Sequence, residues 1–535
     1  MSLRFIMHQY SVCLSRSLAL LLCLLSVLTS SLYGQQQEPE MISLPADTLT
    51  VAGSLLEQRR PGYDLSVSPV VSPLYFFSER CSRTDLSLGG ALRRDGGEAM
   101  IPQLGKQDID GSVHIESALR QRNNFAWGAA SYTYRATEGI RFNETTDYPL
   151  LAPYVMGDTA YTARLHQDLY TFGAGTVHRL GNWLLSLTAD YRATFAYRTQ
   201  DPRPRNLATH LEGQIGIGYQ LTDYALALAG TLGRYKQNNQ VGFLSELGVA
   251  SEYHFTGVGG DYYRFRGGNT SLFYQGLSYG ISLGLTPTSE ARQGFYALAA
   301  WHLLTTDRII RELNNLPLST LSSHTIDLQA GYTARSARLG RWGVALYTQG
   351  DIRRGAVHLF GDPKGNIYPR IATERSYYGQ TLEFGAKGFW DSQDTPRTPW
   401  SWGISTSLGY RLHEEDLLPQ AERLFYHLGG TLAPYVSFHR GQYFVSLNPT
   451  YSVWAQTGHP SLQLAPQHQP IPTYAETLER AYQIASSTQM TYGLSMTHGY
   501  QLSSRYALWL SLDYLHTQTS LCGSNYGAIR CGISF

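Results

Sequence analysis

The side chains best suited to acyl-transfer chemistry are serines and two histidines close to the C-terminus. A serine activated by a histidine could attack a lipid ester, and His498 and His516 lie in neighbouring segments with many serines nearby. His516 follows Tyr514 at the end of one segment, and His498 continues an outward apolar face. Such positions are typical of anchors at a membrane interface, so the sequence predicts no catalytic residue. The face that includes His498 comprises Tyr492, Leu494, Met496 and Tyr500.

Clustered carboxylates are the second set of groups that could do chemistry. The run 414–416 is Glu-Glu-Asp and is predicted to be a solvated loop. Asp108 and Asp110 precede Gly111 as at the start of a calcium loop, but the later ligands are missing, so a turn is predicted. The sequence contains no Cys and His spacing typical of a zinc site and no phosphate-binding loop. It also lacks the helix with paired histidines of metalloproteases and the strand-turn-helix motif that presents a nucleophilic serine. We therefore predict no metal, no cofactor and no enzymatic activity.

A third set of charged residues alternates with apolar residues and is predicted to point into the lumen of a barrel. A charge is tolerated there because water or an opposite charge is available. Their signs are mixed, so no strong preference for anions or cations follows. They could line a water-filled pore, or they could pair across the lumen and help to fill it, and pairing is favoured for any single residue. These residues are Asp190, Arg192, Arg198, Glu212, Asp327, Arg335, Asp351, Arg353, Glu383, Lys387, Arg411 and Asp513.

The elements that would position these charges are long alternating strands. From Trp183 to Arg198, apolar and polar residues alternate with Leu184 as the main exception, over far more than the 5 to 6 residues of a usual soluble strand. A barrel strand needs about 9 to 11 residues to cross the apolar slab, and only a closed cylinder pairs every backbone group there. The same alternation recurs in 211–221, 326–335, 382–387, 402–412 and 506–514.

This pattern predicts an all-β fold, a transmembrane antiparallel up-and-down β-barrel of about 16 to 18 strands. A soluble sandwich would also alternate, and alternation alone does not exclude it. Short periplasmic turns and long extracellular loops are expected. The predicted turns are Gly181-Asn182, Thr222-Asp223, Gly340-Arg341, Arg440-Gly441 and Ser503-Ser504, and the predicted loops are 138–160, 256–268, 305–321, 355–375 and 456–486.

Two further connectors do not fit one strand count. The segments 199–206 and 391–399 are alike in composition, which suggests that they share a side of the membrane. Counting the strands through Tyr235 to Tyr253 conflicts with this, because it places the two segments on opposite sides of the membrane.

Both ends of the chain indicate export. A basic start with Arg4 and Arg16 precedes the apolar run 18–28, which is too short for a membrane helix of about 20 residues and suits a signal peptide. The chain closes on Phe535 at the end of an alternating strand. We predict a signal peptide over 1–34, a periplasmic N-terminal leader or lumen segment over 35–83, and a barrel over 84–535.

Composition excludes one class of partner. The 42 Lys and Arg residues balance 41 Asp and Glu residues, whereas a nucleic-acid binder normally carries a basic excess. Tyrosine is abundant, with 38 residues, which suits a membrane interface. Three cysteines remain after the signal peptide, Cys81, Cys522 and Cys531, and are expected to be small buried or lipid-facing residues.

The chain resembles the outer-membrane β-barrel proteins of Gram-negative bacteria. The likeness rests on the signal at Arg4–Gly34, the alternating strands and the terminal Ile533-Ser534-Phe535. It looks closest to large uncharacterised barrels, similar to porins or transporters, with a short periplasmic N-terminus. The resemblance implies an outer-membrane location, contact with outer-membrane lipid, and assembly by the barrel-assembly machinery through the C-terminal strand that ends in Phe535. It transfers no site residues.

One N-terminal motif bears on energised transport. Asp47-Thr48-Leu49-Thr50-Val51 is similar to the short box by which TonB-dependent transporters engage their energising partner. Those transporters use a 22-stranded barrel closed by a separate plug domain. The roughly 30 residues between Val51 and the first expected strand leave no room for that domain, so the sequence argues against an energising periplasmic partner.

Three functional classes follow from this architecture. A porin, channel or transporter for a small solute is favoured, because a barrel this wide usually encloses an aqueous space. The alternative is a surface binding or adhesion protein that acts through its long extracellular loops and has a largely filled lumen. A barrel enzyme would need titratable groups clustered near one rim, which the sequence does not show.

Overall fold

The computed structural model describes residues 55–56, 59–60, 71–77, 82–159, 164–244, 252–267, 271–288, 293–336, 340–365, 367–392, 399–467 and 469–535. The predicted signal peptide, the motif at 47–51 and Cys81 lie outside these residues. No helix of the described part is both long enough and apolar enough to cross a membrane.

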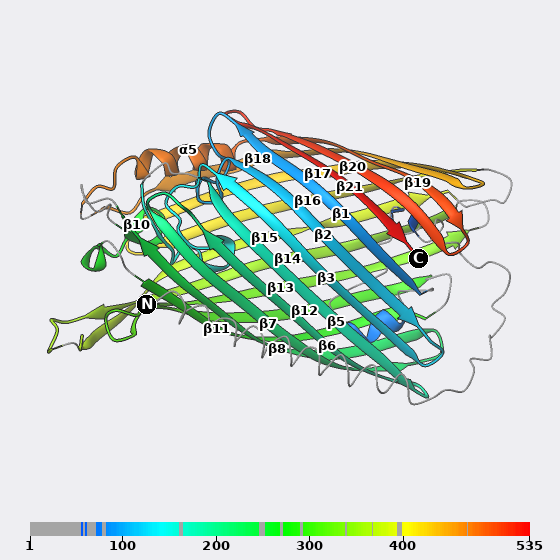
Figure 1. The fold of residues 1–535 in the computed structure, drawn as a ribbon, viewed down its shortest axis with the longest axis horizontal. Coiled ribbons are helices and arrows are strands. Elements are labelled where there is room, and N and C mark those ends of the chain that lie inside the picture. Colours follow the sequence, from blue (N-terminus) through cyan, green and yellow to red (C-terminus); the bar gives the residue numbers. More distant parts are fainter. Residues whose placement is uncertain are drawn as a thin grey trace. The chain divides into compact units, whose positions relative to one another are not determined.

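Eighteen antiparallel strands form one closed barrel (Figure 1), which confirms the predicted fold class and fixes the strand number. The first nine are β1 (Arg83–Gly96), β2 (Gln107–Arg120), β3 (Asn124–Glu138), β5 (Leu165–Leu180), β6 (Trp183–Tyr197), β7 (Arg203–Gln220), β8 (Tyr224–Gly242), β11 (Ser271–Pro287) and β12 (Gly294–Ile310). The other nine are β13 (Leu316–Ser336), β14 (Gly340–Phe360), β15 (Arg370–Asp391), β16 (Trp400–Leu417), β17 (Ala421–Arg440), β18 (Tyr443–Gln463), β19 (Gln489–Ser503), β20 (Tyr506–Gln518) and β21 (Gly523–Ser534).

The barrel closes where the first and last strands meet. β1 pairs with β2 on one side and with β21 on the other, so that no strand edge is left open. The amide of Thr84 donates to the Phe535 carbonyl at 2.6 Å, and the amide of Phe535 donates to the Thr84 carbonyl at 2.8 Å. The C-terminal residue is thus part of the closing seam.

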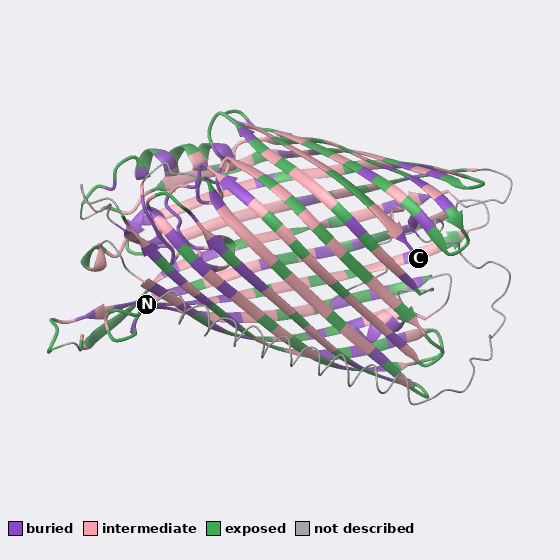
Figure 2. Ribbon diagram, in the orientation of Figure 1, coloured by how far each residue is buried: buried purple, intermediate pink, exposed green. Residues whose placement is uncertain are grey.

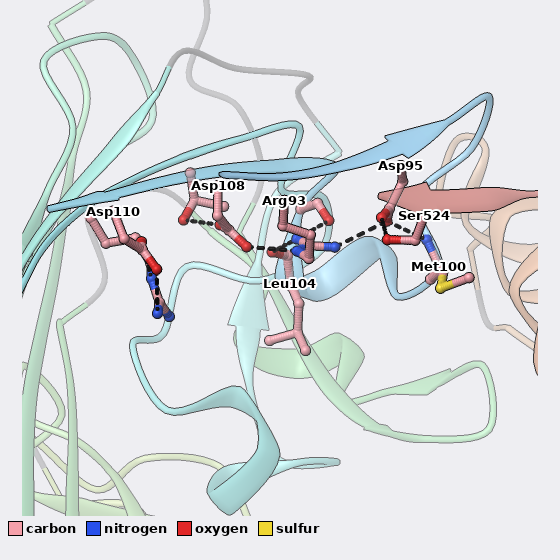
Figure 3. A network of polar contacts seen from close by, with 10 residues as sticks. Arg93, Asp95, Met100, Leu104, Asp108, Asp110 and Ser524 are labelled. Atoms are coloured by element: carbon pink, nitrogen blue, oxygen red, sulfur yellow. Dashed lines mark hydrogen bonds and ion pairs between the residues drawn. The ribbon is translucent and has the colours of Figure 1, made fainter. Parts of the chain in front are cut away.

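A polar network supports this seam near its other end (Figure 3). Arg93 of β1 contacts Asp108 of β2 at 2.7 Å and Asp95 at 3.0 Å. Asp95 is fully buried and accepts hydrogen bonds from the Ser524 hydroxyl of β21 at 2.7 Å and from the Met100 amide at 2.9 Å. The network joins three neighbouring strands through side chains in addition to their backbone ladder.

Exposed and less exposed residues alternate along the strands (Figure 2). On β6, Leu185, Leu187 and Phe195 are 42 to 49% exposed, whereas Ser186 is buried. Fully burying one such apolar side chain is worth about 1.5–3 kcal/mol, so an outer wall of this kind is stable only against lipid. Leu184, the exception to the predicted alternation, is completely buried on the inner face.

The two ends of the barrel differ. The end that carries Phe535, here called the turn end, has the connections at 181–182, 221–223, 441–442 and 504–505. The opposite loop end carries the long connections 139–164, 243–270 and 464–488. The predicted turn at Gly340-Arg341 is wrong, because both residues already pair with β13 in strand β14.

Three predicted loops are wrong in whole or in part, because the strands extend further than the apolar pattern suggests. Most of 305–321 belongs to β12 and β13, which are joined by 311–315. Most of 355–375 belongs to β14 and β15. The segment 456–486 contains the end of β18 and the helix α5 (Tyr474–Ser486).

The proposed common side of 199–206 and 391–399 is also wrong. The first segment joins β6 to β7 at the loop end, and the second joins β15 to β16 at the turn end. The strand count failed because 235–253 is not one strand: β8 ends at Gly242, and Tyr253 begins a separate short strand.

Two carboxylate groups predicted as loops lie on strands instead. Asp108 and Asp110 belong to β2, where Arg135 of β3 contacts Asp110 at 2.7 Å and the Thr137 hydroxyl donates to Asp108 at 2.7 Å. The run 414–416 belongs to β16. Both predictions failed because cross-strand basic or hydroxyl partners, which the local sequence does not show, stabilise these acids in the sheet.

Candidate functional site in the barrel lumen

Two connections of the loop end fold back against inward-facing wall residues. Residues 139–159 contain the helix α4 (Tyr148–Leu151) and the strand β4 (Met156–Gly157), and residues 252–267 contain β9 (Tyr253–Gly257), β10 (Gly260–Asp261) and η3 (Tyr263–Phe265). β4, β9 and β10 form a small separate sheet. We call these two connections the lumen plug; β10 lies at the end of the barrel away from Phe535 (Figure 1).

An apolar core attaches the plug to the wall. Phe142, Val155, Met156 and Phe255 of the plug are 0 to 3% exposed. They belong to one cluster with wall residues of β8, β11, β12, β13 and β14. The wall members of this cluster are Tyr235, Val241, Leu272, Tyr274, Leu304, Ile310, Leu316, Leu318 and Phe360.

Wall arginines hold the plug by charged contacts. Arg192 makes a two-pronged contact with Asp147, at 2.7 and 3.1 Å. Tyr235 donates to the same carboxylate at 2.9 Å. Arg198 contacts both oxygens of Glu144 at 3.0 and 3.1 Å. The bidentate pair of Arg192 with Asp147 fixes orientation as well as adding energy.

Two more arginines hold the plug through its backbone. Arg353 of β14 donates to the carbonyls of Ala152 at 2.9 Å and Pro149 at 2.8 Å. Arg308 of β12, which is 1% exposed, donates to the carbonyls of Val155 at 3.2 Å and Phe255 at 3.1 Å. Arg308 thereby joins both connections of the plug to one strand.

The plug also contains buried carboxylates. Glu144 and Glu252 are 6% and 0% exposed. Burial raises the pKa of Glu144 above its usual range although Arg198 opposes the shift. Burial, followed by repulsion from Glu144 and Asp158, raises the pKa of Glu252 well above its usual range. His254 stays neutral, because burial lowers its pKa to about 3.

A cavity of about 350 Å³ lies between the plug, the wall and α5, within the range of small-molecule sites. Its lining contains two ion pairs and the carboxylate of Glu414, which accepts a hydrogen bond from the Gln380 side-chain amide. Arg353 contacts Asp351 at 2.6 Å, and Arg423 contacts Glu415 at 3.1 Å and donates to Nε2 of His413 at 2.7 Å. Aromatic side chains complete the lining, among them Phe142, Tyr148, Phe255, Tyr377, Phe425 and Tyr474.

A second cavity of about 270 Å³ lies nearer the turn end. Asp190, Glu212 and His302 line it together with Ser72 and Tyr75 of the short helix η1 (Ser72–Phe77). His302 contacts Glu212 at 3.0 Å, and the Ser278 hydroxyl donates to Glu212 at 3.0 Å. The lumen therefore contains two cavities with polar linings, one at the loop end and one nearer the turn end.

The other charged residues predicted for the lumen have contacts along the wall. Arg411 contacts Glu383 at 2.6 Å, and its guanidinium lies 3.4 Å from the centre of the Trp454 ring. The ammonium of Lys387 lies 4.3 Å from the centre of the Tyr347 ring. Asp513 contacts Arg530 at 2.8 Å. Asp327 lies opposite Gln349 in the β13–β14 ladder, and the exposed Arg335 lies opposite Arg341.

The structure brings some predicted residues together and leaves others apart. Asp351 and Arg353 share the larger cavity, Asp190 and Glu212 share the smaller one, and Glu383 pairs with Arg411. That all twelve line a solute path stays a prediction.

Sequence reasoning missed the plug residues Glu144, Asp147 and Glu252, because connections carry no periodic signal that shows where they fold. It missed Arg308 because this residue lies in 305–321, which the sequence predicts to be a loop. The alternation of β12, followed from Tyr296 through Leu298 and Leu304, would have placed Arg308 on the inner face. Among the residues that the structure describes, no group of three or more His, Cys, Asp or Glu side chains could hold a metal ion.

Comparisons with known proteins show two distant structural likenesses and one family. The ferripyoverdine receptor of the outer membrane of Pseudomonas aeruginosa is 8% identical, with a TM-score of 0.33 and coverage of 85% of this chain and 72% of that one. BauA, the ferric preacinetobactin receptor from Acinetobacter baumannii, is 7% identical, with a TM-score of 0.37 and coverage of 85% and 79%. Values this low carry no inference about a shared ligand.

No curated protein matches the chain. The model of a family of unknown function (DUF6850) matches residues 73–535. This match runs from Pro73 in η1 through every barrel strand to Phe535. The chain therefore belongs to the family of unknown function DUF6850.

Proposed function

We propose that this protein is a gated transporter of the bacterial outer membrane that moves a small, uncharged polar solute through its lumen. The observation that carries the proposal is the larger cavity at the loop end, which is formed jointly by the wall, the plug and α5. A site shared between a fixed wall and a separately attached plug can bind a solute and pass it inward when the plug moves.

The chemistry of this cavity supports an uncharged solute. The guanidinium groups of Arg353 and Arg423 already have carboxylate partners, Asp351 and Glu415. An anionic ligand would have to displace one of these partners, and a cationic ligand the Gln380 amide that donates to Glu414. A polyhydroxylated ligand can hydrogen-bond to both members of each pair. Aromatic rings such as Tyr377 and Tyr474 offer faces for its C–H groups.

Location and partners belong to the same proposal. The exposed apolar outer wall and the closed strand order support contact with outer-membrane lipid. The loop end then faces the outside and the turn end the periplasm. Export by a cleaved signal peptide over 1–34 and assembly through the strand that ends in Phe535 complete it. We also propose that the twelve charged residues predicted for the lumen line it, and that no energising partner is needed.

One observation favours the alternative, a surface binding protein with a filled lumen. The plug shares a continuous apolar core with the wall, in which Phe142, Met156 and Phe255 are almost completely buried. A plug held this firmly could serve as a rigid base for the outer loops. The two functions differ in whether loosening the plug opens a path.

Liposome swelling tests the transport proposal. Purified protein in liposomes is diluted into isotonic glucose or sucrose, and uptake of the sugar is followed by light scattering. Arg353→Ala removes the contacts to Ala152 and Pro149 and is expected to raise the swelling rate several-fold above wild type.

The matched control is Arg354→Ala, which alters the adjacent exposed side chain on the opposite face of β14. It is expected to leave swelling unchanged. Swelling rates equal to those of empty liposomes for wild type and for folded Arg353→Ala would reject transport and favour the alternative.

A further inference from the structure

The outer face of the wall carries a cluster of basic side chains on two neighbouring strands. β7 pairs with β8, and β8 pairs in turn with β11. Arg205 of β7 and Arg234 and Lys236 of β8 are exposed, and each is flanked on its strand by less exposed or buried residues. Because successive side chains of a strand point to opposite faces, all three point away from the lumen. Arg205, Arg234 and Lys236 are called the basic patch.

Acidic side chains do not neutralise the basic patch. β7, β8 and β11 contain one acid, Glu212, and it lines the smaller cavity inside the barrel. The acids of the adjoining strand and connections have other partners. Asp201 contacts Arg203 at 2.7 Å, Asp307 accepts a hydrogen bond from a threonine hydroxyl at 2.8 Å, and Glu312 accepts one from a backbone amide at 2.8 Å.

Amide side chains extend the basic patch and divide its cations into two positions. The exposed Gln240 lies opposite Arg205, and the exposed Gln275 lies opposite Lys236. Gln240 follows Lys236 by four residues, so at roughly 3.3 Å per residue the two cationic positions are about 13 Å apart along the strands. Between them, Arg311 of the connection after β12 donates to a β8 side-chain amide at 3.1 Å. The basic patch can therefore contact two anionic groups of one ligand.

The outer face between the basic patch and the turn end is aliphatic. Leu211 of β7 and Leu277 of β11 lie directly opposite Arg234 in the two ladders. Together with the outward residues that follow towards the turn end, they are 44 to 71% exposed. Acyl chains attached to a head group on the basic patch would lie against this surface. Its members are Leu211, Ile215, Leu226, Leu228, Leu232, Leu277, Ile281 and Leu283.

The basic patch lies at the height of lipid head groups on the loop-end side. β8 begins at the turn end with Tyr224, and Arg234 follows ten residues later. Barrel strands tilted by about 35–45° rise roughly 2.5 Å per residue along the membrane normal, so about 10 residues cross an apolar band about 25 Å tall. Arg234 therefore lies at the edge of the apolar band, and Lys236 lies just beyond it.

The neighbouring strands have aromatic residues at the loop-end side instead. Tyr132 of β3 and Tyr170 of β5 are exposed, with ring centres 5.1 Å apart. Tyr197 of β6 lies directly opposite Arg205 of β7. Tyrosine is the usual residue where a membrane protein meets the lipid head groups. The change from tyrosine to clustered cations between β6 and β8 therefore sets this part of the wall apart and indicates an anionic partner.

We propose that the basic patch is a binding site on the outside of the barrel for an acylated glycolipid with two phosphate groups. One phosphate contacts Arg234 and Lys236, the other contacts Arg205, and the acyl chains lie along the aliphatic surface below. The inference rests on the location given under the proposed function, in which the loop end faces the outside. It does not depend on transport, because the site lies outside the lumen.

Native mass spectrometry of the purified full-length protein in detergent tests the site. The probes are lipid A with two phosphates, the same lipid A with one phosphate, and phosphatidylglycerol. We expect wild type to bind the first probe at least fivefold more tightly than the other two. Arg234→Gln combined with Lys236→Gln should weaken that binding at least tenfold, because each Lys or Arg beside an anionic lipid surface contributes about fivefold in affinity.

The matched control is Arg440→Gln combined with Arg505→Gln, which removes two exposed cations at the turn end and should bind as wild type does. Heat modification on gels verifies that each barrel is folded, and Arg205→Gln, expected to bind about fivefold more weakly, replaces the double variant if that does not fold. A folded patch variant that binds as tightly as the control overturns the site. Equal affinity for all three probes overturns the assigned ligand. Binding as expected without sugar uptake would instead retain the site and reject the transport proposal.

Discussion

Removing Arg198 should release the plug segment around Glu144. The two side chains are 1% and 5% exposed and lie 3.0 Å apart. At a pH well above 7, near which burial places the pKa of Glu144, Arg198→Ala leaves its carboxylate buried without a cation, and breaking a buried pair in this way costs about 3–5 kcal/mol. Since about 1.4 kcal/mol corresponds to a factor of ten, local opening should become two to three and a half orders of magnitude more frequent.

Hydrogen–deuterium exchange measures this opening directly. The Phe142 amide donates to the Asp158 carbonyl at 3.0 Å, and the Glu144 amide donates to the Met156 carbonyl at 2.8 Å. Both amides should exchange faster in Arg198→Ala by that factor, while the ladder between β1 and β21 should keep its protection.

Two further variants control the interpretation. Arg203→Ala removes an exposed pair with Asp201, in which Arg203 is 37% exposed, and should change exchange by less than tenfold because such pairs contribute about 0.2–1 kcal/mol. Adding Glu144→Gln to Arg198→Ala removes the buried charge and should restore much of the protection. Unchanged exchange at Phe142 and Glu144 in folded Arg198→Ala would refute the assigned role of the pair.

Three other predictions follow. Burial raises the pKa of Glu252 and Glu144, so the contribution of these groups to plug stability is complete below the ordinary carboxyl pKa near 4.5 and is lost as the pH rises through the raised values. Plug exchange should therefore accelerate as the pH rises through about 7, the raised pKa of Glu144, and Glu252→Gln should flatten that profile. Phe76→Ala should weaken the packing of η1 against the wall by about 3–5 kcal/mol, which faster deuterium exchange of the Leu74 amide, a donor to the Val71 carbonyl, would show and unchanged exchange would contradict. Gly429→Ala places a Cβ 2.1 Å from the Val453 carbonyl and should lower the temperature of heat modification on gels, whereas Gly527→Ala, with no atom within 4 Å of its Cβ, should not.

The wall of the barrel was predictable because lipid imposes a period of two on every strand. Leu185, Leu187 and Phe195 face outward as this rule requires. The main exception, Leu184, is consistent with something apolar inside, and the structure identifies it as Phe76 of η1. A departure from the pattern was therefore informative about the lumen.

The contents of the lumen were not predictable from the pattern. Glu144, Asp147 and Glu252 lie in connections, where position depends on contacts with strands far away in the sequence. The strands also extend beyond the apolar slab, where alternation with lipid no longer constrains them. For that reason the local sequence of 305–321 indicated a loop, although Arg308 lies there on an inward strand face.

The central claim is that a gated path runs through this barrel, and ion current through the purified full-length protein in a planar bilayer tests it most directly. We predict stepwise openings that are infrequent in wild type and become frequent in Arg353→Ala. A folded, heat-modifiable barrel that stays silent both as wild type and as this variant would contradict it.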